Sequence, residues 1–547
     1  MTRSTHKRRR ISLVGLIALG LVLVTALPAS AASYPQISGE GSSWAANAVL
    51  QWQADMATQG VTVQFKPNGS SQGRKDFAQQ IGTDYAMSEI PYSGDTADPQ
   101  DNFTPQFAYS LMPMVAGGTS FMYNLRVNGG RLETLKLSQA AIAGIFSGQI
   151  TQWNDPTIKA DNAGTNLPVA PITVVVRSEG SGATAQFTLW MLRQFPAAYR
   201  YLCQTSGSCD GVHATSYFPT AKMKNFVGQS GSNGVTTYTS NTPFTINYDE
   251  YSYAQQAGFP VAQVKNAAGY YTVPTDSAVA VALIKAKINT NTKDPNYLSQ
   301  DLSEVYPYTD PRTYPISSYS YFIMPRQTTD SFTPAKGSTL GYFTQYSLCE
   351  GQRTMGKLGY SPLPMNLVLA AMEQVKLIPG VDQPTLDKIT ATEKGVTQGN
   401  ANPCNNPTFK PGDDPSHNVL VDTAPFPAGC DAACQAPWKK PGAAQNLNGP
   451  QFQGVGITAK NDAVPVPNAS SAAQTCDPDT GICSNSTSAK GVGNISPVSA
   501  VIPGQLGWAG PQTLMVIVGL LIATLLLAPP LASRLLSGAA RRARGKR

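Results

Sequence analysis

One short segment constrains the fold of this chain more than any other. Within residues 171–187 a β-branched apolar run leads into Arg177, a Ser/Gly-rich loop follows, and large apolar residues then recur at helical spacing. This order predicts a strand, a loop and the first turns of a helix, with a cation at the end of the strand. A guanidinium fork and the free N–H groups of a first helical turn both suit a tetrahedral oxyanion. Most Ser/Gly loops after strands are only turns, so this segment alone does not establish an anion site.

Two further loops of the same kind lie nearer the N-terminus. Residues 39–44 (GEGSSW) precede a helix-type pattern, and strand-like residues 61–65 lead to residues 68–73 (NGSSQG) and a second helix-type pattern. Each serine alone is typical of a helix N-cap. Three loops whose helices could begin at one cleft favour an oxyanion site instead. The next strand-like run ends in Glu89, whose position alone is typical of an exposed turn.

The two ends of the chain predict export and a membrane anchor. Residues 1–31 have the pattern of a secretory signal. Five basic residues lie among the first ten, an apolar core follows at 11–27, and small residues end the segment. Residues 513–533 carry no charge and are long enough to cross a bilayer. The basic tail 534–547 follows, and the positive-inside rule places it in the cytoplasm. We therefore expect a single-pass protein of the cell membrane whose N-terminal part is extracellular.

The charge balance changes once these two ends are set aside. The chain has 40 Lys and Arg against 33 Asp and Glu, a formal net charge of +7. Eleven of the basic residues lie in the signal and the tail, so the exported part carries 29 basic and 33 acidic residues. It therefore lacks the general basic surface that nucleic-acid binding requires, and an anion would bind at a local site.

All eight cysteines lie in the exported part, where an even number favours disulfides. Neighbouring cysteines are candidate pairs, although spacing alone does not decide the connectivity. The candidate pairs are Cys203–Cys209, Cys349–Cys404, Cys430–Cys434 and Cys476–Cys483. A zinc site at Cys430 and Cys434 is disfavoured because no matching His/Cys pair accompanies them, and we expect neither a metal nor another cofactor.

Composition divides the exported part into two regions. Residues 33–385 alternate strand-like and helix-like segments, which predicts an α/β architecture. This length exceeds one ordinary hydrophobic core, so we expect two lobes. Residues 386–512 turn to Asn, Pro, Gly, Ser and Ala with few large apolar residues, which predicts a cysteine-containing linker or a loosely packed segment held by disulfides.

Several motifs beyond the three loops carry a resemblance to a known family. They are Tyr-Asn-Leu at 123–125, Trp-Asn-Asp-Pro at 153–156, Arg-Ser-x-Gly-Ser-Gly at 177–182, Tyr-Pro-Ile-Ser-Ser-Tyr at 314–319 and Gly-Tyr-Ser-Pro-Leu-Pro at 359–364. Through these motifs, residues 39–375 resemble the phosphate-binding proteins of the phosphate-specific ABC transporter, the PstS family. The Trp-Asn-Asp-Pro and Arg-Ser-x-Gly-Ser-Gly segments are the most specific of them.

The resemblance implies a type II periplasmic-binding-protein fold, an α/β fold with two lobes joined by crossing strands and an anion cleft between them. Lobe 1 would be discontinuous, with residues 32–118 and 312–385, and lobe 2 would comprise residues 119–311. The linker 386–512 and one transmembrane helix at 513–533 would follow.

The resemblance also implies a set of ligand-binding residues and no catalytic residue. Phosphate would be bound by Ser43, Trp44, Ser70, Glu89, Arg177, Ser181 and Gly182. Glu179 would support Arg177 as its acidic partner. Glu89 would take the place of the aspartate that, in the family, accepts the hydrogen bond of protonated phosphate.

Two positions depart from the family pattern. The family has aspartate where Glu89 stands, so this carboxylate would lie about one methylene deeper in the cleft. The family usually has threonine where Ala183 stands, so one hydroxyl donor is lost unless Thr184 replaces it. The Glu89 carboxylate could still select phosphate over sulfate. A buried carboxylate can accept a hydrogen bond from phosphate but meets only lone pairs on sulfate.

These points predict an extracellular, membrane-anchored protein that binds inorganic phosphate and passes it to the permease subunits of an ABC importer. The alternative is a cell-surface interaction protein with the same fold and a degraded or altered oxyanion site, which Glu89 and Ala183 would explain. An enzyme such as a phosphoesterase is disfavoured, because His213 and His417 lie in no recognisable catalytic motif and His6 lies in the signal.

Overall fold

The computed structural model describes residues 34–92, 101, 103–430, 475–476 and 483–484. The chain divides into one compact unit up to Gly456 and a second from Ile457. In the second unit β18 (Thr475–Cys476) pairs antiparallel with β19 (Cys483–Ser484), and the register places Cys476 opposite Cys483. The expected signal peptide, transmembrane helix and basic tail lie outside the described residues. Within these residues, no helix is both long and apolar enough to cross a membrane.

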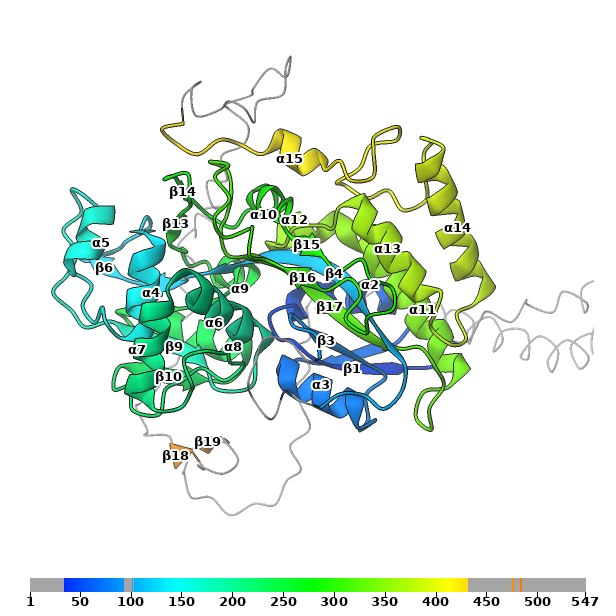
Figure 1. Ribbon diagram of the computed structural model, residues 1–547, viewed down its shortest axis with the longest axis horizontal. Coiled ribbons are helices and arrows are strands. Elements are labelled where there is room, and N and C mark those ends of the chain that lie inside the picture. Colours follow the sequence, from blue (N-terminus) through cyan, green and yellow to red (C-terminus); the bar gives the residue numbers. More distant parts are fainter. Residues whose placement is uncertain (1–33, 93–100, 102, 431–474, 477–482, 485–547) are drawn as a thin grey trace, which may run out of the picture. The chain divides into compact units, whose positions relative to one another are not determined.

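The first unit is built around two main β-sheets (Figure 1). The larger sheet has six strands in the order β12-β4-β17-β3-β1-β2. β1 pairs in parallel with β2 and β3, whereas β17 runs antiparallel to both β3 and β4. Every residue of β3, β4 and β17 is buried, as expected for strands covered on both faces. The strands are β1 (Ile37–Gly41), β2 (Val63–Lys66), β3 (Tyr85–Ser88), β4 (Tyr109–Ser120), β12 (Asp249–Glu250) and β17 (Ser317–Pro325).

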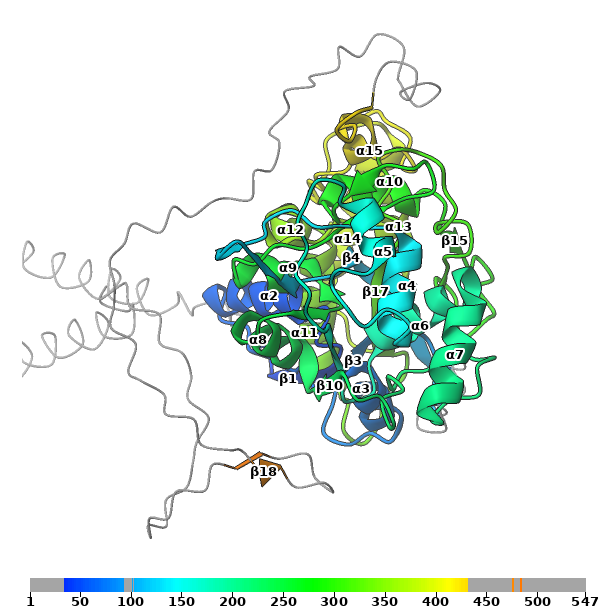
Figure 2. The same ribbon diagram turned by 90° about the vertical axis from the view of Figure 1, so that its left-hand side faces the viewer.

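The helices of the larger sheet complete lobe 1. α2 (Ala46–Thr58) follows β1 and α3 (Ser70–Ala78) follows β2, and the two helices lie on opposite faces of the sheet (Figure 2). α11 (Pro334–Leu348) packs against α2 and β1, and α13 (Met365–Val375) packs against β4 and α11. The rings of Trp52 in α2 and Phe322 in β17 stack with centroids 6.4 Å apart, so the helix and the sheet share one core.

The second sheet organises lobe 2. Its four strands have the order β10-β9-β11-β5, with β9 parallel to β10 and β11 and with β5 antiparallel at the edge. Helices α4, α6 and α7 lie together on one side and α8 lies on the other (Figure 2). Phe187 of α6 stacks on Tyr248 and meets Phe146 of α4 edge-on, so aromatic rings fill this core. The elements are β5 (Tyr123–Asn124), β9 (Thr173–Arg177), β10 (Phe226–Gln229), β11 (Thr245–Asn247), α4 (Gln139–Ser147), α6 (Gly182–Gln194), α7 (Pro196–Ser206) and α8 (Gly231–Asn241).

Crossing segments join the two lobes. The chain leaves lobe 1 between β4 and β5, returns to the first sheet between β11 and β12, and later adds β17 to it. This is the two-lobe α/β architecture that the sequence predicts. The smaller elements are β6 (Arg126–Val127), β7 (Gly130–Arg131), β8 (Lys136–Leu137), α5 (Pro156–Asp161), α9 (Tyr251–Gln256), β13 (Gln263–Lys265), β14 (Tyr271–Thr272), α10 (Asp276–Leu283), β15 (Lys287–Ile288), β16 (Gln300–Asp301), the 3-10 helix η2 (Glu350–Thr354), α12 (Met355–Leu358), α14 (Gln383–Thr397) and α15 (Val419–Thr423).

The packing differs from the expected lobe boundary at residue 311. α10 lies in the range expected for lobe 2, yet it packs on β4 and β17 of lobe 1. Gln300 of β16 also exchanges hydrogen bonds with the backbone of Tyr319 in β17, at 3.0 and 2.7 Å. The expected boundary therefore falls too late. An apolar helix that lies between two crossings can cover either sheet, and its periodicity does not say which.

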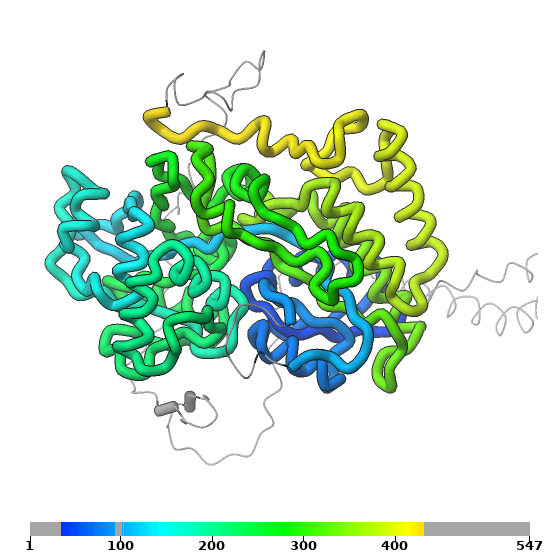
Figure 3. The backbone as a smooth tube through the Cα atoms, viewed as in Figure 1, coloured from blue at the N-terminus to red at the C-terminus, as the bar shows by residue number. Residues whose placement is uncertain are grey.

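A second correction concerns the linker expected from residue 386. α14 packs on α11 (Figures 1 and 3). The side chains of Ile389 and Val396 in α14 are buried. Residues 398–430, which we call the C-terminal extension, also stay attached to lobe 1. There Asn406 and Thr408 each donate a side-chain hydrogen bond to the carbonyl of Leu363 at 3.0 Å. The linker alternative is therefore wrong for residues up to 430, and the alternative of a segment held by a disulfide fits them, because Cys404 is bonded to Cys349 and polar side chains hold the segment in place.

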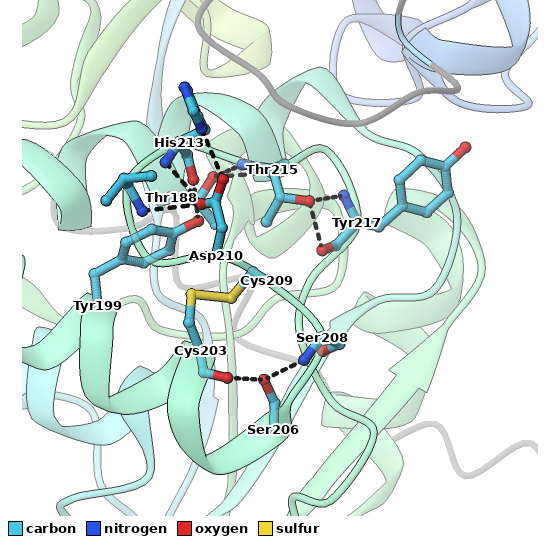
Figure 4. Close-up of a disulfide and its surroundings, with 11 residues drawn as sticks. Thr188, Tyr199, Cys203, Ser206, Ser208, Cys209, Asp210, His213, Thr215 and Tyr217 are labelled. Carbon is cyan, nitrogen blue, oxygen red and sulfur yellow. Dashed lines mark hydrogen bonds and ion pairs between the residues drawn. A yellow bond between two sulfur atoms is a disulfide. The ribbon is translucent and has the colours of Figure 1, made fainter.

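Two of the candidate disulfides are present in the first unit. Cys203 and Cys209 close a short loop after α7, and Cys349 joins Cys404 of the C-terminal extension. Near the first bridge, the hydroxyl of Tyr199 donates to the carbonyl of His213 at 2.7 Å and holds the following loop (Figure 4). Cys430 is also disulfide-bonded, and residue 434 lies outside the described part.

Replacing both Cys349 and Cys404 by serine should lower the free energy of unfolding by about 4 kcal/mol. The bridge spans a sequence separation of 55 residues and restricts the unfolded chain accordingly. The same change at Cys203 and Cys209, separated by 6 residues, should cost only about 2 kcal/mol. Denaturant unfolding followed by tryptophan fluorescence measures both losses. Equal losses in the two double variants would contradict this account.

Candidate oxyanion site

The candidate residues lie where strands end and helices begin. In each lobe the carboxyl ends of the parallel strands meet at one edge of the sheet, which is the usual position of a ligand in such folds. Ser43 and Trp44 lie between β1 and α2, Ser70 opens α3, Glu89 follows β3, Arg177 ends β9, and Ser181 and Gly182 begin α6.

These residues come together although the sequence separates them widely. Arg177 donates from Nη2 to the hydroxyl of Ser43 at 2.6 Å, which links lobe 2 to lobe 1. The hydroxyl of Ser70 donates to Glu89 Oε2 at 2.9 Å. A Cβ built on Gly182 would overlap that same carboxylate oxygen. The predicted loops of both lobes therefore line one buried site.

Arg177 is almost completely buried, and carboxylates balance its charge. Glu179 Oε1 accepts from Arg177 Nε at 2.7 Å and also from Nη2. Asp249 Oδ2 lies 3.8 Å from Arg177 Nη1. Burial by itself would lower the pKa of Arg177, but the charges of Glu179 and Asp249 raise it above its usual value. The guanidinium is therefore a permanent cation held in one orientation.

Hydroxyl groups surround the carboxylate of Glu89. Oε1 accepts from Ser42 and from Ser320, the latter at 3.0 Å, and Oε2 accepts from Ser70 at 2.9 Å. The backbone carbonyl of Glu89 accepts from Gln186 Nε2 of α6 at 3.0 Å. Because an ionised carboxylate offers only acceptors, any ligand group that faces it must be a donor.

Backbone donors complete the site. Within the described part of the chain, the N–H groups of Ser43, Trp44, Gly182 and Ala183 have no hydrogen-bond acceptor. The first two lie just before α2 and the last two form the first turn of α6, where helical N–H groups have no partner in the helix itself. Together with the guanidinium, they provide the donor-rich, positively polarised surroundings that suit an oxyanion.

The sequence matches known phosphate-binding proteins over most of its first unit. The protein-family model for the PBP superfamily domain matches residues 26–350. Phosphate-binding protein PstS 2 of Mycobacterium tuberculosis is 33% identical over 310 residues, which cover 56% of this chain and 76% of that relative. Phosphate-binding protein PstS 3 of the same organism is 31% identical over 331 residues, which cover 60% and 82%. The chain belongs to the PstS family. Members of this family are substrate-binding proteins of transporters and not enzymes.

Solved structures resemble the chain at lower sequence identity. A phosphate-binding protein from Stenotrophomonas maltophilia has a TM-score of 0.41 and 19% identity and covers 69% of this chain and 98% of its own. A high-affinity periplasmic phosphate-binding protein bound with phosphate has a TM-score of 0.47 and 19% identity, with 64% and 100% covered. Membership in the PstS family does not favour the alternative of a surface interaction protein.

The ring of Trp44 anchors its loop to lobe 1. It packs edge-on against Tyr360 with centroids 5.9 Å apart, and the hydroxyl of Tyr360 donates to the carbonyl of Trp44 at 2.7 Å. A Cβ built on Gly117 of β4 would lie 2.6 Å from this ring, so only glycine fits there. Among the described residues, the indole Nε1 of Trp44 is buried without a hydrogen-bond partner, so Trp44 has both an indole N–H and a backbone N–H that are not engaged.

The start of α6 differs from the PstS pattern as the sequence indicates. Ser181 caps the helix by accepting from the N–H of Thr184 at 3.3 Å. The hydroxyl of Thr184 lies 2.5 Å from that of Tyr248 and so has a partner within lobe 2. Ala183 is buried and brings only its N–H to the site. Thr184 therefore does not replace the hydroxyl that Ala183 lacks.

Four polar side chains of the site were missed by the sequence analysis. They are Ser42, Ser232, Asp249 and Ser320. Ser232 could have been found, because residues 229–234 (QSGSNG) repeat the pattern of a Ser/Gly loop after a strand. The Ser232 N–H donates to Ser43 Oγ at 3.0 Å. Nothing local distinguishes Asp249 or Ser320 from other polar residues.

Replacing Gly182 by alanine should lower the free energy of unfolding by about 1–3 kcal/mol, because the new methyl group would overlap Glu89 Oε2 and lie 2.9 Å from Ser70 Oγ. Gly130 provides the control, since a Cβ there would have Val127 O, at 3.9 Å, as its only near neighbour. The Gly130→Ala change should stay within about 0.5 kcal/mol of the unchanged protein. Denaturant unfolding gives both values. A Gly182→Ala protein as stable as the control would show that this contact is not close.

Proposed function

We propose that the protein binds inorganic phosphate between its two lobes and passes it to the permease subunits of an ABC importer. The observation that carries the proposal is the buried Arg177, which donates to the hydroxyls of Ser43 in lobe 1 and Ser232 in lobe 2. The names of the relatives, phosphate-binding proteins PstS 2 and PstS 3, support phosphate as the ligand.

In this proposal the donors divide between the lobes. Lobe 1 contributes the hydroxyls of Ser43 and Ser70 and the N–H of Trp44. Lobe 2 contributes Arg177, the hydroxyl of Ser181 and the N–H of Gly182. The guanidinium fork and the first turn of α6 would take up most of the anion's charge, since both favour negative charge.

Glu89 would distinguish phosphate from sulfate. Near neutral pH phosphate keeps at least one proton and can donate it in a hydrogen bond to the carboxylate, whereas sulfate has none to donate. A buried carboxylate against the lone pairs of sulfate leaves both groups without a partner, which costs roughly 1–3 kcal/mol or more. The hydroxyls of Ser42 and Ser320 would hold the Glu89 carboxylate in position, while the hydroxyl of Ser70 would turn from Glu89 to the anion.

Contacts around the site support capture by closure of the lobes. The N–H of Ser71 in α3 donates to the carbonyl of Gly180 in the lobe 2 loop at 3.2 Å. Asp101 accepts from Ser71 at 2.5 Å and from Arg74 in lobe 1, and from Ser216 in lobe 2. These bonds would form as the lobes meet, exclude water and strengthen the contacts to the anion.

The proposal includes the membrane anchor that the sequence predicts. A transmembrane helix at residues 513–533, with the basic tail in the cytoplasm, would keep the binding unit on the extracellular side. The segment between the C-terminal extension and this helix would act as a tether and keep the protein near its permease at high effective concentration. The candidate pair Cys476–Cys483 would then lie in this tether, and Cys430–Cys434 would lie where the C-terminal extension joins it.

Arg177→Ala should abolish phosphate binding, because the buried site would keep its carboxylates and lose its cation. Arg177→Lys should weaken binding strongly as well, since an ammonium group cannot reproduce the planar fork. Arg193→Ala, on the partly exposed surface of the next helix, α6, should bind normally. Calorimetric titration of the ligand-stripped proteins with phosphate measures all three. Unchanged phosphate affinity in Arg177→Ala would overturn the site assignment.

Glu89→Gln should narrow the preference for phosphate over sulfate by at least tenfold. The amide keeps the size of the side chain, and the surrounding serine hydroxyls can turn to accept its N–H groups. Its N–H₂ group can also donate to sulfate, so sulfate should bind more tightly and phosphate less tightly. Competition calorimetry with the two anions measures the ratio, with Glu304→Gln at an exposed position as the control. An unchanged ratio would remove Glu89 from the selectivity mechanism.

A further inference from the structure

Asp249 is a second acidic partner of Arg177 that the proposed binding of phosphate does not use. It lies on β12, the short strand by which the chain returns from lobe 2 to the first sheet. Oδ1 accepts from Ser232 Oγ at 2.9 Å and from the N–H of Glu250 at 2.7 Å. Oδ2 lies 3.8 Å from Arg177 Nη1 and, among the described residues, is buried without a hydrogen-bond partner.

The charges around Arg177 do not balance when both of its carboxylate partners are ionised. Glu179 bonds the guanidinium directly, so the single positive charge already has one counter-charge. The Asp249 carboxylate adds a second negative charge at a site with almost no access to water. An entering oxyanion would bring a third, and repulsion between buried charges is screened weakly. Anion binding and an ionised Asp249 therefore oppose each other.

Asp249 can change its charge near neutral pH. Burial raises its pKa to about 6, although the charge of Arg177 and hydrogen bonds from the Glu250 backbone and Ser232 act in the opposite direction. Glu179 raises this pKa further through its negative charge. A carboxyl group in this position is ionised before an anion arrives and is easily protonated once it does.

The other titratable groups that face Asp249 lie on its own strand and on two neighbouring elements. They are Tyr248 and Glu250 beside it, Tyr253 of α9 and Tyr360 before α13. Burial raises the pKa of all three tyrosines above the usual value, so they stay neutral. Burial also raises the pKa of Glu250, whose Oε2 accepts from the N–H of Ser252 at 2.6 Å. Asp249 itself lies within salt-bridge distance of the Arg177 guanidinium.

We propose that Asp249 takes up one proton when an oxyanion binds beside Arg177. The proton comes from solvent and joins Oδ2, the oxygen without a donor. Arg177 then keeps Glu179 as its one carboxylate partner, and its remaining positive field acts on the anion. Because Asp249 takes up a proton when the anion binds, it makes anion binding tighter at lower pH. This inference rests on the proposed function, that an oxyanion binds at this site.

The test is calorimetric titration of the ligand-stripped full-length protein with inorganic phosphate near pH 7. Repeating it in buffers of different ionisation enthalpy gives the number of protons taken up on binding. The unchanged protein should take up more protons than Asp249→Asn, with a difference approaching one. The ratio of its Kd to that of Asp249→Asn should also rise with pH above about 6, approaching tenfold for each pH unit. The titration of phosphate itself is common to both proteins and cancels in this ratio.

Two further variants test the assignment to this carboxyl group. Asp276 is a half-buried aspartate whose pKa burial raises, but it lies on α10 and not beside Arg177, so Asp276→Asn should take up as many protons as the unchanged protein. Glu250→Gln should also retain the uptake, although it changes the neighbouring residue. Equal proton uptake in the unchanged protein and Asp249→Asn would overturn the proposal. So would a loss of uptake in Glu250→Gln alone.

A measurement on the unchanged protein keeps the proposal testable if Asp249→Asn fails to fold. Infrared difference spectra on addition of phosphate should show a gain in the C=O band of a protonated carboxyl group. The absence of this gain would overturn the proposal while leaving phosphate binding intact. Failure of the unchanged protein to bind phosphate would instead overturn the proposed function, and this inference with it.

Discussion

The rest of this structure depends on the burial of one positive charge between two lobes. A guanidinium removed from water is costly unless carboxylates and hydrogen-bond acceptors surround it. Glu179 is only two residues from Arg177 in the chain, whereas Ser43, Ser232 and Asp249 come from three other segments. The need to balance this charge therefore brings residues of both lobes together, and the same arrangement creates a place where an anion is favoured.

Helix starts contribute the second part of this environment. α2, α3, α6 and α8 each begin after a parallel strand, and hydrogen bonds join residues at or near their starts between the two lobes. Their loops consist of serine and glycine for two physical reasons. Serine hydroxyls can donate or accept as their partners require, and glycine permits close approach, as Gly182 does beside Glu89. The site is thus built mainly from adaptable hydroxyls around two kinds of rigid charge, Arg177 and its carboxylate partners.

Local patterns predicted much of the fold and of the site, but not all of it. The strand, loop and helix around Arg177 were predictable, because periodicity and Ser/Gly composition are local properties. Asp249 and Ser320 were not, because nothing near them in the sequence shows that β12 and β17 enter the same sheet beside β4. For the C-terminal extension the sequence left a linker and a disulfide-held segment open, since its attachment rests on Cys404 and on polar side chains that reach Leu363.

By itself, the sequence determined the strands and helix starts around the Ser/Gly loops, the cation at the end of β9 and the departure from aspartate at Glu89. These follow from short-range chemistry, in which a few neighbouring residues decide the local conformation. Only the tertiary structure decided which charges share the buried space around Arg177, and that α10 and the C-terminal extension belong to lobe 1. Packing between segments far apart in the chain depends on the shape and burial of whole surfaces, and local periodicity carries no record of either.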